Sequence, residues 1–180
     1  MGPTVSNIRF IRFTMNKQEL IQHLSLVEHI EGGYFYETHR SQEVITTDRP
    51  GQERSILTSI YYLLTADRPL DHFHKNKSDI LHYFHLGSAI TYLIVHPEGR
   101  LERVKLGHNI KEGEVMQLLV PGGCWKAGIL ESGEFGLIGE TVVPGFDYRD
   151  MELATEETFL AQFPHLREEL APYVSSKTSH

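Results

Sequence analysis

Hydrophobic and polar positions alternate over short segments through most of the chain, and residues typical of turns separate these segments. The pattern predicts strands at 34–38, 55–64, 80–85, 89–95, 101–106, 115–120, 125–130 and 135–143. The turns between them are rich in glycine and proline, as in Pro121-Gly122-Gly123. Many short strands with no amphipathic helix between them favour a sandwich or barrel over a parallel α/β sheet.

Helical signals flank this strand pattern at its two ends. Asn16, with Glu19 three positions later, forms a capping-box pattern that predicts a short first helix. Near the other end, Thr155 before acidic residues predicts a helix that Pro164 interrupts. We therefore expect an all-β fold with short N- and C-terminal helices.

The same pattern sets the boundaries of the domain. We place a flexible leader at residues 1–15, the β-domain at residues 16–174 and a frayed tail at residues 175–180. No internal repeat or low-complexity run divides the chain further. A length of 180 residues fits one domain.

Composition narrows the classes of partner. The chain has 17 Lys and Arg against 24 Asp and Glu, a formal net charge of -7, which disfavours binding to a nucleic-acid backbone. No apolar run approaches the roughly 20 residues that span a bilayer, so we expect no membrane partner. Cys124 is the single cysteine, which excludes an intrachain disulfide and favours a reducing compartment. We expect a cytoplasmic protein.

Histidines carry the clearest chemical signal. Eleven are present, and His72-Phe73-His74 places two imidazoles at positions i and i+2. On an extended strand both would point to the same face, so they could converge on one metal ion or one substrate. Imidazole suits Zn, Fe, Ni, Cu or Mn, and a nearby carboxylate would complete the ligand set. The alternative is a solvated polar loop without a ligand.

Several segments resemble a known family. Asp71 to Ile80, followed by Gly87, resembles the first cupin motif, and Gly113 through Pro121-Gly122-Gly123 resembles the second. The chain is similar to the uncharacterised cupin_5 (DUF985) family over about residues 20–154, through the segments at 30–38, 59–64, 120–125 and 143–148. This resemblance implies a jelly-roll β-barrel, and cupins commonly pair as homodimers, so we expect a homodimer.

The resemblance also implies a metal site, but the chain departs from the general cupin pattern. Where the second motif normally supplies a histidine ligand, Lys126 stands at or near the position, and an ammonium cannot ligate a cation without losing its proton. The remaining candidate ligands are His72, His74 and Asp79, with Gln117 or water completing the set. We expect weak binding of a divalent ion, with Ni, Zn, Cu, Fe and Mn as the candidates.

Acid–base chemistry is the other candidate role of this region. The residues that the resemblance places near the barrel are His74, Tyr83, His85 and Trp125. Alternation predicts that Asp79, Tyr83 and His85 share one side of their strand, opposite Ile80, His82 and Phe84. We expect the polar side to face inward, with the apolar side inward as the alternative. We expect the indole of Trp125 at or beside the cavity and Gln117 as a further ligand-binding residue.

Two classes of function follow from these expectations. The first is an enzyme acting on a small polar molecule, by an isomerase-like or epimerase-like reaction or by an oxygenase-like reaction at a metal. It assigns catalysis to His74, Tyr83 and His85, and requires His74 and His85 to point into one pocket. The second is a non-catalytic protein that binds a metal or a small ligand.

Overall fold

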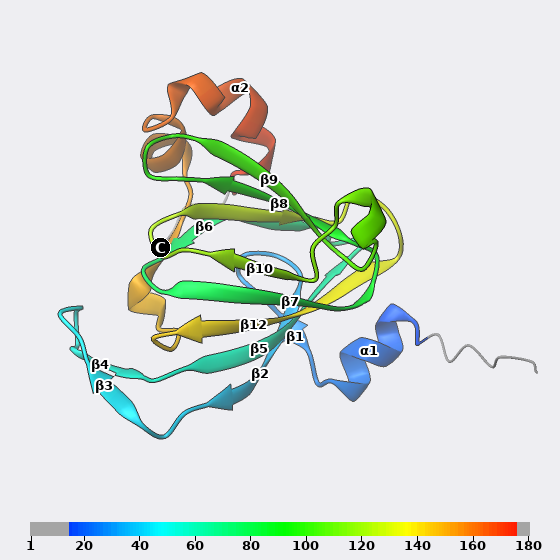
Figure 1. The fold of residues 1–180 in the computed structure, drawn as a ribbon, viewed down its shortest axis with the longest axis horizontal. Helices are drawn as coiled ribbons and strands as arrows, with labels where there is room; N and C mark the ends of the chain where they lie inside the picture. The colour runs from blue at the N-terminus through cyan, green and yellow to red at the C-terminus, as the bar shows by residue number, and fades with distance from the viewer. Residues whose placement is uncertain (1–14, 176–180) are drawn as a thin grey trace, which may run out of the picture.

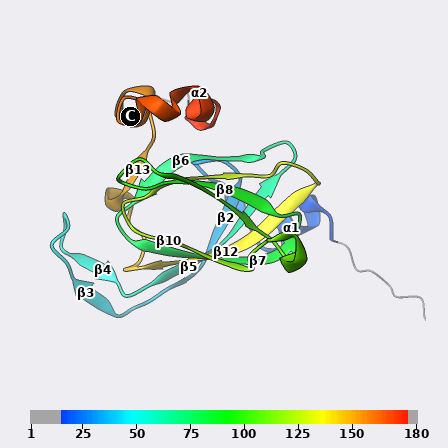
Figure 2. The same ribbon diagram turned by 45° about the horizontal axis from the view of Figure 1, so that its top comes forward.

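The computed structural model describes residues 15–175. The predicted leader, apart from Met15, and the predicted tail beyond Ser175 lie outside these residues. Two antiparallel sheets face each other (Figures 1 and 2). The all-β jelly-roll class predicted from the sequence is confirmed, in the form of a sandwich rather than a closed barrel.

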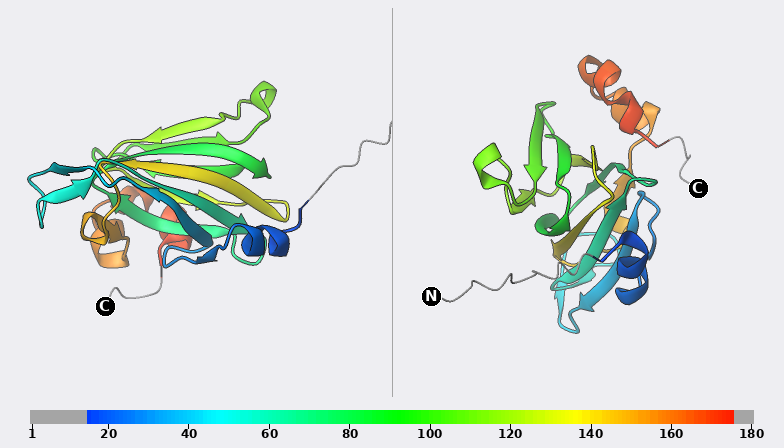
Figure 3. Two further views of the ribbon diagram at one scale, coloured as in Figure 1. Left: turned by 90° about the horizontal axis from the view of Figure 1, so that it is seen from below. Right: turned by 90° about the vertical axis from the view of Figure 1, so that its right-hand side faces the viewer.

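The strands of each sheet come from distant parts of the chain. The six-stranded sheet has the order β1 (Val27–Glu28), β2 (Tyr34–Arg40), β5 (Thr58–Thr65), β12 (Phe135–Val143), β7 (Asp79–Gly87) and β10 (Gln117–Val120). The five-stranded sheet has the order β13 (Met151–Leu153), β6 (Leu70–Asn76), β11 (Trp125–Ile129), β8 (Ile90–Val95) and β9 (Leu101–Leu106). A separate hairpin, β3 (Val44–Thr46) and β4 (Glu53–Ser55), projects beyond one end of the sheets (Figure 3).

Short helical segments lie at the predicted ends of the β-domain. The capping box of Asn16 and Glu19 is present and begins α1 (Lys17–His23). Thr155 caps a single π-helical turn at Glu156–Leu160, and Pro164 begins the next turn. The remaining helical segments are 3₁₀ turns at Ile110–Glu112, Tyr148–Asp150, Pro164–Leu166 and Ala171–Tyr173, and α2 at Arg167–Leu170. No helix in the described part of the chain is long and apolar enough to cross a membrane.

Apolar side chains fill both the space between the sheets and the outer face of the smaller sheet. Between the sheets, Tyr62, Tyr92 and Ile138 belong to one buried cluster. The C-terminal segment covers the outer face of β6, β11 and β8, where Phe159 packs against Phe73 and Trp125 (Figure 1). The five-stranded sheet is therefore buried on both faces, which explains why β8 reads as an almost continuous apolar run.

A bulge in β6 changes which side chains point between the sheets. On β11, Lys126 pairs with His74 and Gly128 pairs with Asp71, so two residues of β6 lie opposite one residue of β11. Residues three positions apart on a regular strand point to opposite faces. Because of the bulge, Asp71 and His74 instead both point to the inner face. Phe73, between them, points to the outer face under the C-terminal segment. Sequence alternation did not predict this change of face.

The loop at Glu31-Gly32-Gly33 closes one side of the sandwich. The Glu31 carbonyl accepts a hydrogen bond from the His72 backbone N–H at 2.7 Å, and the Gly32 carbonyl accepts one from the Tyr62 hydroxyl at 2.7 Å. Gly32 has φ +121°, and a Cβ there would lie 2.0 Å from the carbonyl oxygen of Leu70. Only glycine permits this approach, which carries the Glu31 side chain between the sheets.

Replacing Gly32 with alanine is expected to lower the free energy of unfolding by about 2 kcal/mol or more, because the new Cβ collides with backbone as well as straining φ. Gly113→Ala is the matched control, since Gly113 has φ +83° and a Cβ at that position would meet nothing within 4 Å. It should cost only about 1 kcal/mol. Urea denaturation measures both variants, and equal losses would contradict a packing role for Gly32.

Candidate functional site

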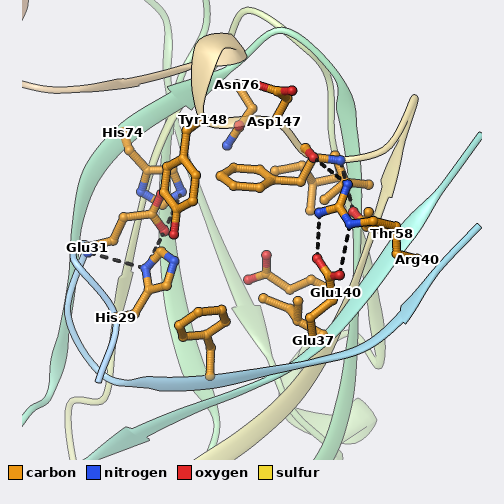
Figure 4. Close-up of a pocket in the computed structure, with 15 residues that line it drawn as sticks. His29, Glu31, Glu37, Arg40, Thr58, His74, Asn76, Glu140, Asp147 and Tyr148 are labelled. Atoms are coloured by element: carbon orange, nitrogen blue, oxygen red, sulfur yellow. Dashed lines mark hydrogen bonds and ion pairs between the residues drawn. The ribbon is translucent and has the colours of Figure 1, made fainter. Parts of the chain in front are cut away.

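A cavity of about 430 Å³ opens at the end of the sandwich where β5 and β7 begin and β2, β6 and β12 end (Figure 4). Its polar lining residues are His29, Glu31, Glu37, Arg40, Thr58, His74, Asn76, Glu140, Asp147 and Tyr148. Its apolar lining residues are Phe35, Ile60, Ile80, Val142 and Phe146. A concave, mixed site of this size suits a small molecule.

The Glu31 carboxyl lies between two imidazoles at the inner wall of this cavity. Its Oε2 atom is 3.3 Å from Nδ1 of His29 and 3.4 Å from Nε2 of His74. The His74 Nδ1 atom lies 2.8 Å from the carbonyl oxygen of His72, so this nitrogen carries the hydrogen and donates it. The His29 Nδ1 atom accepts from the Glu31 backbone N–H at 3.3 Å. The His74 Nε2 atom therefore directs its lone pair at this carboxyl oxygen, whereas the lone pair of His29 Nδ1 already accepts the backbone N–H.

The lone pair of His74 Nε2 faces a carboxyl oxygen, and this contact favours a proton or a cation between the two atoms. Burial, followed by the negative charge of Asp71, raises the pKa of Glu31 well above its usual value. Burial lowers the pKa of His29 to about 4 and lowers that of His74 well below its usual range. The raised pKa of Glu31 and the lowered pKa values of both histidines favour a proton on the carboxyl group over one on either imidazole.

A buried ammonium lies on the far side of His74. The Lys126 Nζ atom is 3.6 Å from Oδ2 of Asp71 and 3.8 Å from Oε1 of Glu140. Burial acts to lower the pKa of Lys126, but the surrounding carboxylates outweigh it and raise the pKa, so the lysine stays charged. Glu140 stays ionised in turn, because Lys126 offsets the effect of burial and lowers its pKa. Burial raises the pKa of Asp71 to about 7 against the pull of Lys126.

His82 lies opposite Glu140 on the neighbouring strand. Its Nε2 atom lies 3.4 Å from Oε1 of Glu140, and its Nδ1 atom lies 3.3 Å from the carbonyl oxygen of Leu118. Burial lowers the pKa of His82 to about 4. The site therefore combines Glu31, whose pKa is raised, with Glu140, whose pKa is lowered, and both side chains line one cavity (Figure 4).

The inner cluster also offers ligands to a metal ion. Glu31, Asp71 and His74 each present one ligand atom, and these atoms lie within 4.8 Å of one another. The hydrogen bond from His74 Nδ1 to a backbone carbonyl is typical of histidine ligands, because it leaves Nε2 for the metal. The donor set could therefore hold a divalent cation. The Lys126 ammonium beside Asp71 opposes it electrostatically.

Of the metal ligands predicted from the sequence, the structure brings only His74 to this cluster. His72 lines a separate hollow with Gly32 and Arg68, on the other side of the loop that carries Glu31. The β6 bulge separates the two imidazoles that a regular strand would align. Asp79 is exposed, and its Oδ1 atom accepts from the Gly122 backbone N–H at 2.8 Å. His72, His74 and Asp79 do not form one site in this geometry.

The expectation that the polar side of β7 faces inward needs correction. Ile80 and His82 are 3% and 0% exposed and point between the sheets, whereas His85 is exposed on the outer face. There His85 packs edge-on against Tyr61 at 5.8 Å between ring centroids. Tyr83 shares the outer side and lies opposite Gln117 of β10, which is exposed. Tyr83, His85 and Gln117 do not line the cavity, so His74 has no partner from the predicted catalytic set.

Trp125 is also placed differently from the expectation. Its indole is 2% exposed and packs under the C-terminal segment, 5.1 Å from the Phe159 ring by centroids. It lies on the outer face of β11, and Lys126, the next residue, points between the sheets. Strand alternation fixes this outcome, because adjacent residues cannot share a face.

Sequence reasoning missed Glu31, Glu140 and His29 as site residues. Glu31 belongs to a segment that carries the family resemblance, but its neighbouring glycines indicated a turn and not a buried carboxyl group. Glu140 stands between Ile138 and Val142 in the alternation of β12, which is a usable signal for an inward carboxylate. His29 follows the two-residue strand β1 and has no comparable signal.

Lys126→Met is expected to lower the free energy of unfolding by about 3 kcal/mol or more, because it leaves buried Glu140 without its countercharge. In the double variant Lys126→Met/Glu140→Gln, the free energy of unfolding should fall by less than the sum of the decreases in the two single variants. Lys105→Met is the control, since Lys105 is half exposed and lies 3.7 Å from Glu114. Denaturation of all four proteins checks this, and additive losses in the double variant would contradict the coupling.

Comparisons with known proteins agree with this architecture. Residues 18–154 match the model of the family described as the cupin superfamily (DUF985). The chain is 42% identical over 146 residues to the uncharacterized protein YML079W of Saccharomyces cerevisiae, covering 74% of this chain and 72% of that one.

Solved structures of other proteins also superpose on this fold. A hypothetical protein from Leishmania major superposes with a TM-score of 0.84 at 27% identity, over 90% of this chain and 100% of that one. Protein SO0799 from Shewanella oneidensis superposes with a TM-score of 0.81 at 34% identity, over 91% and 100%. Oxalate decarboxylase from Bacillus subtilis shares the fold, with a TM-score of 0.52 at 18% identity over 79% of this chain and 36% of that one. The chain belongs to the DUF985 family of the cupin superfamily.

Proposed function

We propose that this protein binds a small polar molecule in its cavity and transfers a proton on it, in an isomerase-like or epimerase-like reaction. One observation carries the proposal: two carboxyl groups, Glu31 with a raised pKa and Glu140 with a lowered pKa, line the same cavity (Figure 4). A proton donor and a proton acceptor on two walls of one enclosed site are what general acid–base catalysis requires. The roles first assigned to Tyr83 and His85 pass to these two carboxyl groups, and His74 keeps a role beside Glu31.

The proposed step conserves protons. The Glu140 carboxylate removes a proton from a carbon next to a carbonyl group, while the Glu31 carboxyl donates its proton to the carbonyl oxygen. When that carbon bears a hydroxyl group, the product is an enediol. In isomerisation, Glu140 returns the proton to the former carbonyl carbon, and Glu31 takes a proton from the neighbouring hydroxyl, which becomes the new carbonyl group. In epimerisation, the proton returns to the original carbon on its other face, and Glu31 takes its proton back from the oxygen that it protonated. His29 and His74 position Glu31, and Lys126 holds Glu140 in its ionised form.

Solvent deuterium tests this proposal. In D₂O, the protein should accelerate loss of the proton NMR signals next to the carbonyl of dihydroxyacetone or D-fructose. Glu31→Gln and Glu140→Gln should each lower this rate by about 100-fold, the usual size of an acid–base contribution. The control variant Tyr83→Phe/His85→Gln removes the outer-face residues and should keep the rate. Equal exchange in Glu31→Gln and the parent protein would overturn the proposal.

A second candidate is the binding of a divalent metal ion by Glu31, Asp71 and His74, without catalysis or as the basis of an oxygenase-like activity. Its support is the convergence of these three ligand atoms. In this role the ion would replace the proton on Glu31 and supply a Lewis acid at the inner wall. The adjacent Lys126 supports weak binding, which the sequence also led us to expect.

Metal addition separates the two candidates. Calorimetry with Ni²⁺ or Zn²⁺ on metal-free protein should show binding that His74→Ala abolishes and that His72→Ala leaves intact, because His72 lies outside the cluster. Infrared spectra should show a carboxylic-acid band that Glu31→Gln removes and that the bound metal also removes. Loss of binding in His72→Ala would instead favour the His72–His74 pair, and no binding at all would exclude this candidate.

The oligomeric state and the compartment predicted from the sequence stay proposals. The outer face of the six-stranded sheet exposes Tyr36, Leu119 and Val143. An apolar face of this kind supports the homodimer that we propose, with this sheet as its contact. The buried free thiol of Cys124 supports a cytoplasmic location.

A further inference from the structure

The charged side chains around the cavity rim are already matched by partners within the chain. Among the described residues that line the cavity, Arg40 carries the one guanidinium or ammonium group. Its Nε and Nη2 atoms donate to the two carboxyl oxygens of Glu37 at 2.9 and 2.6 Å. Its Nη1 atom donates to the carbonyl of Phe146 at 3.1 Å. A negatively charged ligand would have to break this two-point pair to reach a cation.

The carboxylates of the lining are matched in the same way. Asp147 accepts from the Nε and Nη2 atoms of Arg149 at 2.8 and 2.6 Å, and from the Arg149 backbone N–H at 2.9 Å. Glu140 has Lys126 and His82 behind the wall. A positively charged ligand would therefore meet carboxylates whose charge is already offset, and would lose its hydration without gaining an unpaired counterion.

The same carboxylates keep oxygen lone pairs that their partners do not use. Glu140 and Asp147 can each accept further hydrogen bonds, and Asn76 adds an amide at the wall (Figure 4). Phe146 and Tyr148 form an edge-to-face pair at the rim, 5.0 Å between centroids. Acceptors and aromatic faces together suit a ligand with several hydroxyl donors on a carbon framework.

We propose that the cavity selects an uncharged polyhydroxyl ligand, and that the Glu37–Arg40 ion pair at its rim enforces this selection. The inference rests on the proposed binding of a small polar molecule and adds its charge class. Glu37 and Arg40 are partly exposed, so the pair stands at the entrance and not in the protein core. Removing Glu37 would leave the Arg40 guanidinium available to an anionic ligand.

Matched sugars test the charge selection by calorimetry at neutral pH. Each series compares a hexose, its uronic acid and its amino sugar: glucose, glucuronate and glucosamine, and the galactose and mannose counterparts. In at least one series the neutral hexose should bind about tenfold more tightly than both charged members. Tighter binding of a charged member in every series, or no binding by any sugar, would overturn the proposal.

Glu37→Gln tests the role of the ion pair. It should strengthen uronate binding by about tenfold, through the freed guanidinium, and leave binding of the hexose within about a factor of two. Glu28→Gln is the matched control, because Glu28 pairs with Arg68 at 2.7 Å outside this cavity. If Glu37→Gln leaves uronate binding unchanged, the Glu37–Arg40 ion pair does not enforce the charge selection. A hexose that binds without any deuterium exchange would overturn the proton-transfer function and leave the charge selection in place.

Discussion

The buried ammonium of Lys126 is the interaction on which the interior of this protein depends. It lies 3.6 Å from Asp71 and 3.8 Å from Glu140, with side-chain exposures of 3% or less for the lysine and the aspartate. Three carboxyl groups could not lie between two sheets without a positive charge or protons to compensate them. Lys126 compensates Glu140 and part of Asp71, and the pKa of Glu31 is raised. The position of one lysine therefore separates the pKa values of these carboxyl groups, on which the proposed acid and base roles rest.

The same residue changes what the cupin framework can do here. Lys126 pairs across the strands with His74, and the resemblance to the cupin motifs led us to expect a metal-ligating imidazole at or near its position. A fixed ammonium supplies positive charge to the site without an exchangeable ion, and it disfavours a second cation beside it. Proton transfer and metal binding at Glu31 are therefore alternatives for one position, and they compete for the same lone pairs.

Two local backbone features place Glu31, Asp71 and His74 beside one another. Gly32 allows the loop before β2 to lie against the backbone of β6, and the β6 bulge turns both Asp71 and His74 inward. Neither feature provides chemistry by itself. Each one fixes the direction of side chains that would otherwise point to solvent or to the opposite face, so the site depends on the sheet and loop geometry around it.

The sequence by itself determined the strand-rich class, the terminal helices and the family, because alternation, turn residues and capping boxes are local signals. It also singled out His74 and the unusual Lys126. Only the tertiary structure decided that His72 and Asp79 lie apart from His74, that Tyr83 and His85 face outward, and that Trp125 packs under the C-terminal segment. The physical reason is that a bulge, a sheet covered on both faces and a loop reaching across two sheets depend on pairing between distant segments. Glu31, Asp71 and Glu140 stand far apart in the chain. Their pKa values depend on burial between the two sheets and on the charges of one another and of Lys126, which no single segment of the sequence indicates.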